Sequence, residues 1–231
     1  MSGRHAMAVR LRDGLGEAYD EGMNDVCITF AELLVRLAGG VIAGAKPAAI
    51  FSIPMHVHSG GRWRRLTRED LDEGLRTYAE ALPAYGVRMT VLYRNERRVY
   101  LLVWRPLELS LALEDPRSAE ILSESGYQGA CLDEHLRELR RRLVDYYLSF
   151  ERGAGEFPHE IGVFLGYPPE DVRGFMEGRE ATCRGPWHAY GDERVARRRF
   201  EALAIKERSC QRRFAAGEPF HALFAPEAAC A

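Results

Sequence analysis

The sequence lacks Cys-x-x-Cys pairs, long apolar runs and appreciable net charge. Its five cysteines are scattered through 231 residues. An odd number of isolated cysteines predicts reduced thiols rather than a disulfide framework or a structural zinc module. No window reaches the roughly 20 apolar residues that span a bilayer, and residues 1–23 lack the apolar stretch of a secretory signal. We therefore expect a cytoplasmic protein that does not cross a membrane.

The formal net charge of -2 and a pI near 6.4 give the whole molecule no attraction to nucleic acid or to an anionic membrane. Arginines gather between residues 194 and 213, but glutamates are interspersed among them. Such a pattern favours a solvated or partner-facing helix, so we do not expect nucleic-acid binding.

Apolar periodicity predicts an α+β fold, with a small mixed β-sheet and a helical C-terminal half. We expect a variable lead-in over residues 1–23, a single α+β domain over 24–217 and a tail over 218–231. The expected strands are 47–53, 87–93 and 98–104, with a polar loop over 55–66. The expected helices are 25–37, 67–82, 107–113, 116–123, 131–150 and 192–214, with a helical pair between 157 and 178. Helices should cover one face of the sheet.

The helical pair between residues 157 and 178 combines turn signals, apolar anchors and ionisable side chains. Gly166 ends the first apolar pattern, and Pro168 and Pro169 open the second helix. The spacing also fits a helix-turn-helix, which leaves open a regulatory or adaptor module that binds protein or DNA. The acidic start of the second helix, at Glu170 and Asp171, opposes DNA binding.

Residues 157–175 follow the pattern Phe-Pro-His-Glu-Ile-Gly-x-Phe-Leu-Gly-Tyr-Pro-x-x-Asp-Val-x-Gly-Phe at every fixed position. On this motif, and on segments 37–51 and 185–192, the chain resembles the bacterial family known as the domain of unknown function numbered 3793. It departs from the family pattern at residues 38–40 and at His188 and Ala189. The resemblance spans about residues 24–217 and implies no defined activity. An association of relatives with iron-uptake and flavodoxin genes implies a role in redox or iron metabolism.

Three family-like segments supply the candidate site. The candidate catalytic residues are a proton carrier, a carboxylate and a phenol, namely His159, Glu160 and Tyr190. A cation, two aromatic rings and an imidazole form the candidate cofactor-binding set: Lys46, Tyr167, Trp187 and His188. Such rings can wall a pocket for a flat ligand such as haem or flavin, although aromatic clusters most often build core. A functional site requires Lys46 and Tyr190 to converge on His159.

Several motifs of known chemistry are incomplete. His159-Glu160 is not followed by the second histidine of a zinc protease. His56 and His58 alternate on an extended segment but have no third ligand nearby, so no metal site is predicted. The glycine-rich segment before Lys46 lacks the order of a phosphate-binding loop, which favours a solvated lysine over an anion site there. We expect a protein that binds or acts on a small molecule or an unspecified cofactor, with the adaptor module as the alternative.

Overall fold

A three-stranded antiparallel sheet lies at the centre of the computed structural model, which describes residues 24–59, 61–150 and 155–224. Its strand order is β1-β5-β4, with β1 at Ala48–Pro54, β5 at Arg98–Trp104 and β4 at Arg88–Arg94. The α+β class is confirmed. The sheet is antiparallel rather than mixed, because the β4–β5 hairpin inserts β5 between two strands that both run opposite to it.

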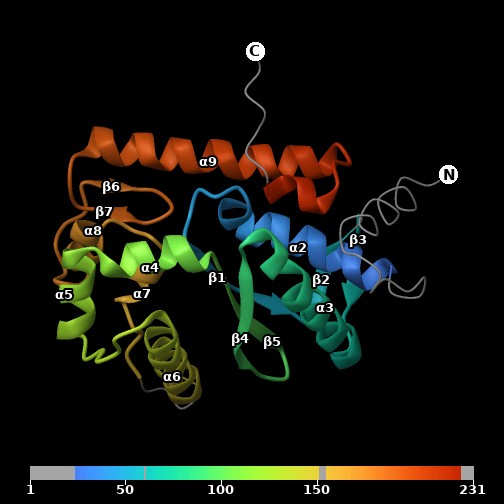
Figure 1. The fold of residues 1–231 in the computed structure, drawn as a ribbon, viewed down its shortest axis with the longest axis horizontal. Coiled ribbons are helices and arrows are strands. Elements are labelled where there is room, and N and C mark those ends of the chain that lie inside the picture. Colours follow the sequence, from blue (N-terminus) through green and yellow to red (C-terminus); the bar gives the residue numbers. More distant parts are fainter. Residues whose placement is uncertain (1–23, 60, 151–154, 225–231) are drawn as a thin grey trace.

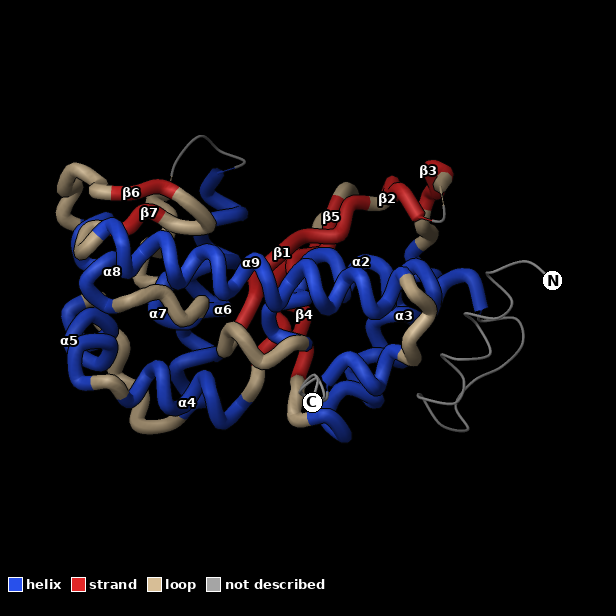
Figure 2. The backbone as a smooth tube through the Cα atoms, turned by 90° about the horizontal axis from the view of Figure 1, so that it is seen from above, coloured by secondary structure: helices blue, strands red, loops and turns tan. Residues whose placement is uncertain are grey.

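Helices cover both faces of this sheet (Figure 2). Successive side chains of a strand point to opposite faces. In β5, Val99, Leu101 and Val103 join one hydrophobic core, whereas Leu102 and Trp104 join another. Helices were expected to cover only one face of the sheet. The continuous apolar run of β5 is instead that of a central strand buried on both sides.

The first core packs the sheet against helices from both ends of the chain (Figure 1). These helices are α2 (Asn24–Ile42), α3 (Arg68–Ala81), η3 (Leu82–Tyr85), α9 (Glu193–Ala215) and η4 (Phe220–Phe224). Thr67 caps α3 and forms a capping box with Asp70. Helix α2 continues past its predicted end at residue 37, because the chain kinks at Ala38 (φ -124) and then resumes helical geometry.

The second core packs the other face against the middle of the chain. Its helices are α4 (Pro106–Glu114), α5 (Pro116–Glu124), α6 (Leu132–Phe150), α7 (Ile161–Phe164) and α8 (Pro169–Met176). Their bounds lie close to the predicted ones, since prolines and capping residues mark the helix starts locally. We call α7, α8 and the turn between them the α7–α8 corner. This packing holds the corner against the sheet.

Two short hairpins complete the described fold. The expected polar loop contains β2 (His56–Ser59) and β3 (Arg62–Arg65), which pair antiparallel. Here the buried Val57 and Ser59 alternate with the exposed His56 and His58, a strand-like pattern that was not predicted. The second hairpin pairs β6 (Cys183–Arg184) with β7 (His188–Ala189).

The folded part extends past the predicted boundary at residue 217, because Phe220 and Leu223 are buried in the first core. The predicted lead-in over residues 1–23 lies outside the described residues. Four cysteines are free thiols as predicted, namely Cys27, Cys131, Cys183 and Cys210, whereas Cys230 lies outside the described residues. Within the described ranges, no helix combines the length and apolarity that a membrane span requires.

Candidate functional site

Gly166 joins two segments of the candidate site that are far apart in the sequence. It ends α7 in a left-handed conformation, with φ +73, which favours glycine. A Cβ atom on Gly166 would lie 2.4 Å from Cδ of Pro47. The α7–α8 corner therefore packs directly on the segment that contains Lys46.

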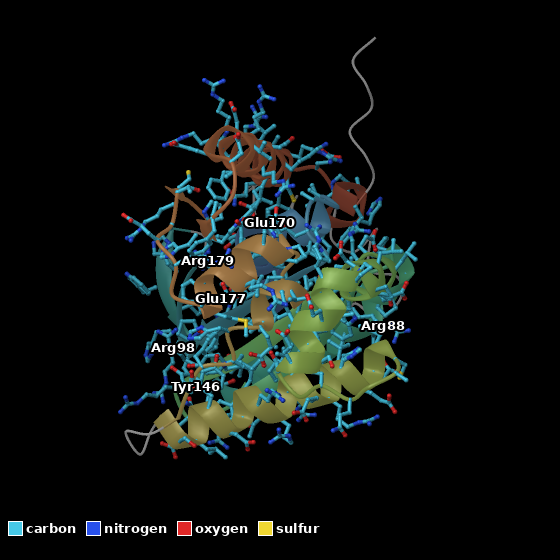
Figure 3. The ribbon with its side chains drawn as sticks, turned by 90° about the vertical axis from the view of Figure 1, so that its left-hand side faces the viewer. Arg88, Arg98, Tyr146, Glu170, Glu177 and Arg179 are labelled. Atoms are coloured by element: carbon cyan, nitrogen blue, oxygen red, sulfur yellow. The ribbon has the colours of Figure 1, made fainter. Side chains whose placement is uncertain are left out.

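A cleft of about 530 Å³ opens between this corner, the sheet and the end of α6. Figure 3 views the molecule from the side of α6 and α8. The sheet contributes Ile50, Phe51, Ser52 and Tyr100, and α6 contributes Tyr147. The remaining ring-bearing side chains of the lining come from the corner and the β6–β7 turn: Phe157, His159, Tyr167, Phe175, Trp187 and His188. The cleft is thus lined mainly by aromatic rings.

The aromatic rings of the cleft pack in two groups. Tyr167 and Trp187 are stacked, with ring centroids 4.9 Å apart and an interplanar angle of 21°. Tyr100 of the sheet and Tyr147 of α6 form the second group, with ring centroids 4.2 Å apart and an interplanar angle of 34°. Burial, followed by the neighbouring Tyr100, raises the pKa of Tyr147 to about 12, so its phenol is neutral at physiological pH. Flat, uncharged surfaces therefore face the cleft.

Asp171 holds one of these walls in place. Its side chain is buried, with one carboxylate oxygen accepting the indole N–H of Trp187 at 2.8 Å. The other oxygen accepts the backbone N–H of Tyr190 at 2.7 Å. Charge-assisted bonds of this kind are stronger than neutral ones. The sequence analysis missed Asp171 as a site residue, although its fixed place in the motif before the buried Val172 was an available signal.

A family model described as a protein of unknown function (DUF3793) matches residues 34–224. The chain belongs to this family. The match runs from within α2 to η4, so the DUF3793 region contains the second hydrophobic core, most of the first and all residues that line the aromatic cleft. No curated protein and no solved structure matches the chain.

The structure brings four of the seven candidate residues to the cleft: His159, Tyr167, Trp187 and His188. The ring of Phe175 lies between the two imidazoles, with its centroid 4.9 Å from that of His159 and 5.7 Å from that of His188. His159 also contacts Phe157. These DUF3793 residues form a continuous rim of rings along one side of the cleft.

The expected convergence of Lys46 and Tyr190 on His159 is not formed. Among the described residues, no hydrogen bond joins His159 to either side chain. Tyr190 instead packs on α8, where a Cβ atom on Gly174 would lie 2.4 Å from the Tyr190 ring. Its ring fills the space that this glycine leaves, which is a packing role.

Lys46 is half-buried, whereas the sequence analysis favoured a solvated loop lysine. Its ammonium lies 5.5 Å from the ring centroid of Tyr167, within reach of a cation–π interaction. Burial lowers the pKa of Lys46, and the nearby Glu207 opposes that shift. The absence of a side chain at Gly40 leaves room for the lysine. A Cβ atom on Gly40 would lie 2.9 Å from Oε1 of Glu207 and 3.2 Å from Cδ of Lys46. Lys46 therefore braces the Tyr167 wall of the cleft.

Glu160 is buried and does not line the aromatic cleft. It accepts a hydrogen bond from the Tyr127 hydroxyl at 3.1 Å and pairs with Arg142 at 3.3 Å. Arg142 also donates to the Ser125 carbonyl at 2.6 Å. Burial, with the charge of Glu160, raises the pKa of Tyr127. Glu160 thus links α6 to the corner, so its role in this structure is to stabilise the fold.

Replacing Glu160 by alanine should reduce the free energy of unfolding by about 2–3 kcal/mol, because Arg142 would lose its buried carboxylate partner. Urea unfolding followed by circular dichroism measures this loss. Glu156→Ala is the matched control, since Glu156 is exposed and only four residues away. Equal midpoints for the two variants would show that the ion pair does not stabilise the fold.

The other motifs provide no second site in the described part of the chain. No group of three histidine, cysteine or acidic side chains there is placed to hold a metal. The helix-turn-helix alternative has a first helix of only one turn. Arg173, the early cation of its second helix, is paired with Glu120 at 3.0 Å and with Glu124 at 2.9 Å.

Proposed function

We propose that this protein binds a flat, largely apolar small molecule in the aromatic cleft. The observation that carries the proposal is the cleft's combination of size and lining, about 530 Å³ with two pairs of packed aromatic rings in its walls. Ligand sites commonly have volumes of about 300–1,000 Å³, with apolar walls and a few polar groups. The imidazoles of His159 and His188 are the polar groups of the rim.

We further propose that the ligand is a flat redox cofactor, such as a flavin or a haem, used in redox or iron metabolism. The residues fit such a group, because Tyr167 and Trp187 offer a stacked aromatic wall and His159 and His188 offer hydrogen bonds at its edge. The redox chemistry would come from the cofactor, while these residues would bind it, orient it and exclude water. The test is native mass spectrometry with an absorption spectrum on protein purified without added cofactor. A bound mass or a visible band supports this ligand class.

The neutral dye N-phenyl-1-naphthylamine, which fluoresces in apolar surroundings, tests the cleft itself. Phe175→Ala should raise the Kd of the dye by about 5- to 10-fold, because a stacked ring contributes roughly 1 kcal/mol to binding. Fluorescence titration gives the Kd values of wild type and variant.

Met176→Ala is the matched control for that titration. Met176 is the next residue of α8 and is 43% exposed, against 42% for Phe175, but it lines a different cleft. Its replacement should leave the Kd unchanged within about 2-fold, since additivity holds for groups that share no partner. Equal losses in both variants, or no dye binding by the wild type, would refute the proposed function.

A further inference from the structure

Arg98 lies next to the aromatic cleft, on the sheet face that forms its floor. Tyr100, two residues further along β5, lines the cleft. Because alternate residues of a strand point to the same face, Arg98 also projects on the cleft side. The register places Arg98 opposite Pro54 and Tyr100 opposite Ser52. Arg98 is therefore the neighbour of Tyr100 on this face, at the end of the strand pair.

A hydrogen bond holds the Arg98 guanidinium at the wall of the cleft. Its Nη1 donates to the Ser52 hydroxyl oxygen at 2.8 Å, and Ser52 lines the cleft. A hydroxyl that accepts one bond still has a proton to donate. Ser52 and Arg98 together therefore present an O–H donor and several N–H donors at one end of an otherwise aromatic surface.

The guanidinium has no acidic partner in the described part of the chain. Other arginines are neutralised by acidic partners: Arg94, at the end of β4, is paired with Asp72 at 2.7 Å, and Arg179, after α8, is paired with Glu177. No ion pair is formed by Arg98, whose only polar side-chain contact among the described residues is the Ser52 hydroxyl. Its positive charge is thus available to a ligand in the cleft.

We propose that the ligand of the cleft carries an anionic group, a carboxylate or a phosphate, which binds to Arg98 and Ser52. This inference rests on the proposed function, because it concerns the same cleft. The planar guanidinium presents parallel N–H donors that match two oxygens of such an anion. The ligand class is therefore a flat ring system with an acidic substituent at the sheet end, and Arg98 is a specificity-determining residue.

Two dyes with the same ring system test the inference. N-phenyl-1-naphthylamine is neutral, and 8-anilinonaphthalene-1-sulfonate adds one anionic group to the same rings. The wild type should bind the sulfonate about 10-fold more tightly, as expected for a charge-assisted hydrogen bond that is partly exposed. Arg98→Gln should abolish this preference and leave the neutral dye within about 2-fold, because the shorter glutamine remains polar but carries no charge.

Arg88→Gln is the charge-matched control. Arg88 is also an exposed arginine of the sheet, and Figure 3 shows it on the opposite side of the view from Arg98. Removing its charge should not change the ratio of the two Kd values. Competition of the bound sulfonate dye by 1-naphthoate and by 1-naphthyl phosphate then distinguishes a carboxylate from a phosphate as the preferred anion.

The outcomes separate the two proposals. If the wild type binds neither dye, the cleft is not a ligand site, and both proposals are overturned. If it binds both dyes equally, or if Arg98→Gln retains the preference, the proposal of an anionic group is overturned. Ligand binding in the cleft is still supported in that case. A preference lost in Arg98→Gln and kept in Arg88→Gln supports the assignment.

Discussion

Replacing Gly166 by alanine should destabilise the protein by about 3 kcal/mol, because two separate costs combine at this position. A side chain at φ +73 is strained by about 1–2 kcal/mol. Its Cβ atom would also lie 2.4 Å from the Pro47 ring, and relief of such overpacking typically costs about 1–3 kcal/mol. Urea unfolding at equilibrium measures the total.

Gly178→Ala is the control that isolates the backbone cost. Gly178 follows α8 with φ +67, but a Cβ atom there would meet nothing within 4 Å. This variant should therefore lose only about 1–2 kcal/mol, the cost of the left-handed conformation alone. The difference between the two variants reports the contact with Pro47. If both variants unfold at the same urea concentration, the corner does not pack tightly on the Lys46 segment.

The second large effect is expected at Asp171. Asp171→Ala should cost about 3 kcal/mol of stability, because the indole N–H of Trp187 and the backbone N–H of Tyr190 would lose a charged acceptor. Binding of N-phenyl-1-naphthylamine should weaken by about 10-fold or more, since Trp187 would no longer be held at the wall of the cleft. Thermal unfolding and dye titration measure the two effects.

Two variants make the Asp171 result specific. Asp171→Asn keeps the shape of the side chain but only one accepting oxygen, so it should lose part of the stability and part of the dye affinity. Asp192→Ala removes the N-cap of α9, where the carboxylate accepts the Val195 N–H at 3.0 Å. That change should cost about 1 kcal/mol without changing dye affinity. Weakened dye binding in Asp192→Ala would mean that general destabilisation, not the position of Trp187, explains the Asp171 effect.

The helices and strands could be predicted because their signals are local. The capping box at Thr67, the prolines that begin α4, α5 and α8, and the apolar periodicity all act within a few residues. The β2–β3 hairpin was missed because it is short and rich in polar residues, with only Val57 and Ser59 buried in β2. The alternation of buried and exposed residues over His56–Ser59 is a weak strand signal, and the polar composition of the segment favoured a loop.

The candidate site was predicted in part, for an identifiable reason. The family-like segments 157–175 and 185–192 pointed to His159, Tyr167, Trp187 and His188, and the structure places all four at one cleft. It does not place Glu160 there, because Arg142 and the buried Tyr127 engage that carboxylate away from the cleft. Adjacent residues in a turn can point in different directions, so a sequence motif alone cannot assign both to one site.

The sequence by itself determined the α+β class, the order of the helices and of the three sheet strands, and the position of the corner, since these follow from periodicity, caps and turn residues. Only the tertiary structure decided which side chains meet. Arg98 and Ser52 are brought together by the register of two strands, and Asp171 reaches Trp187 because α8 packs beside the β6–β7 turn. The physical reason is that such contacts depend on strand register and helix packing, which are set by burial of apolar surface across the whole chain rather than by any local run of residues.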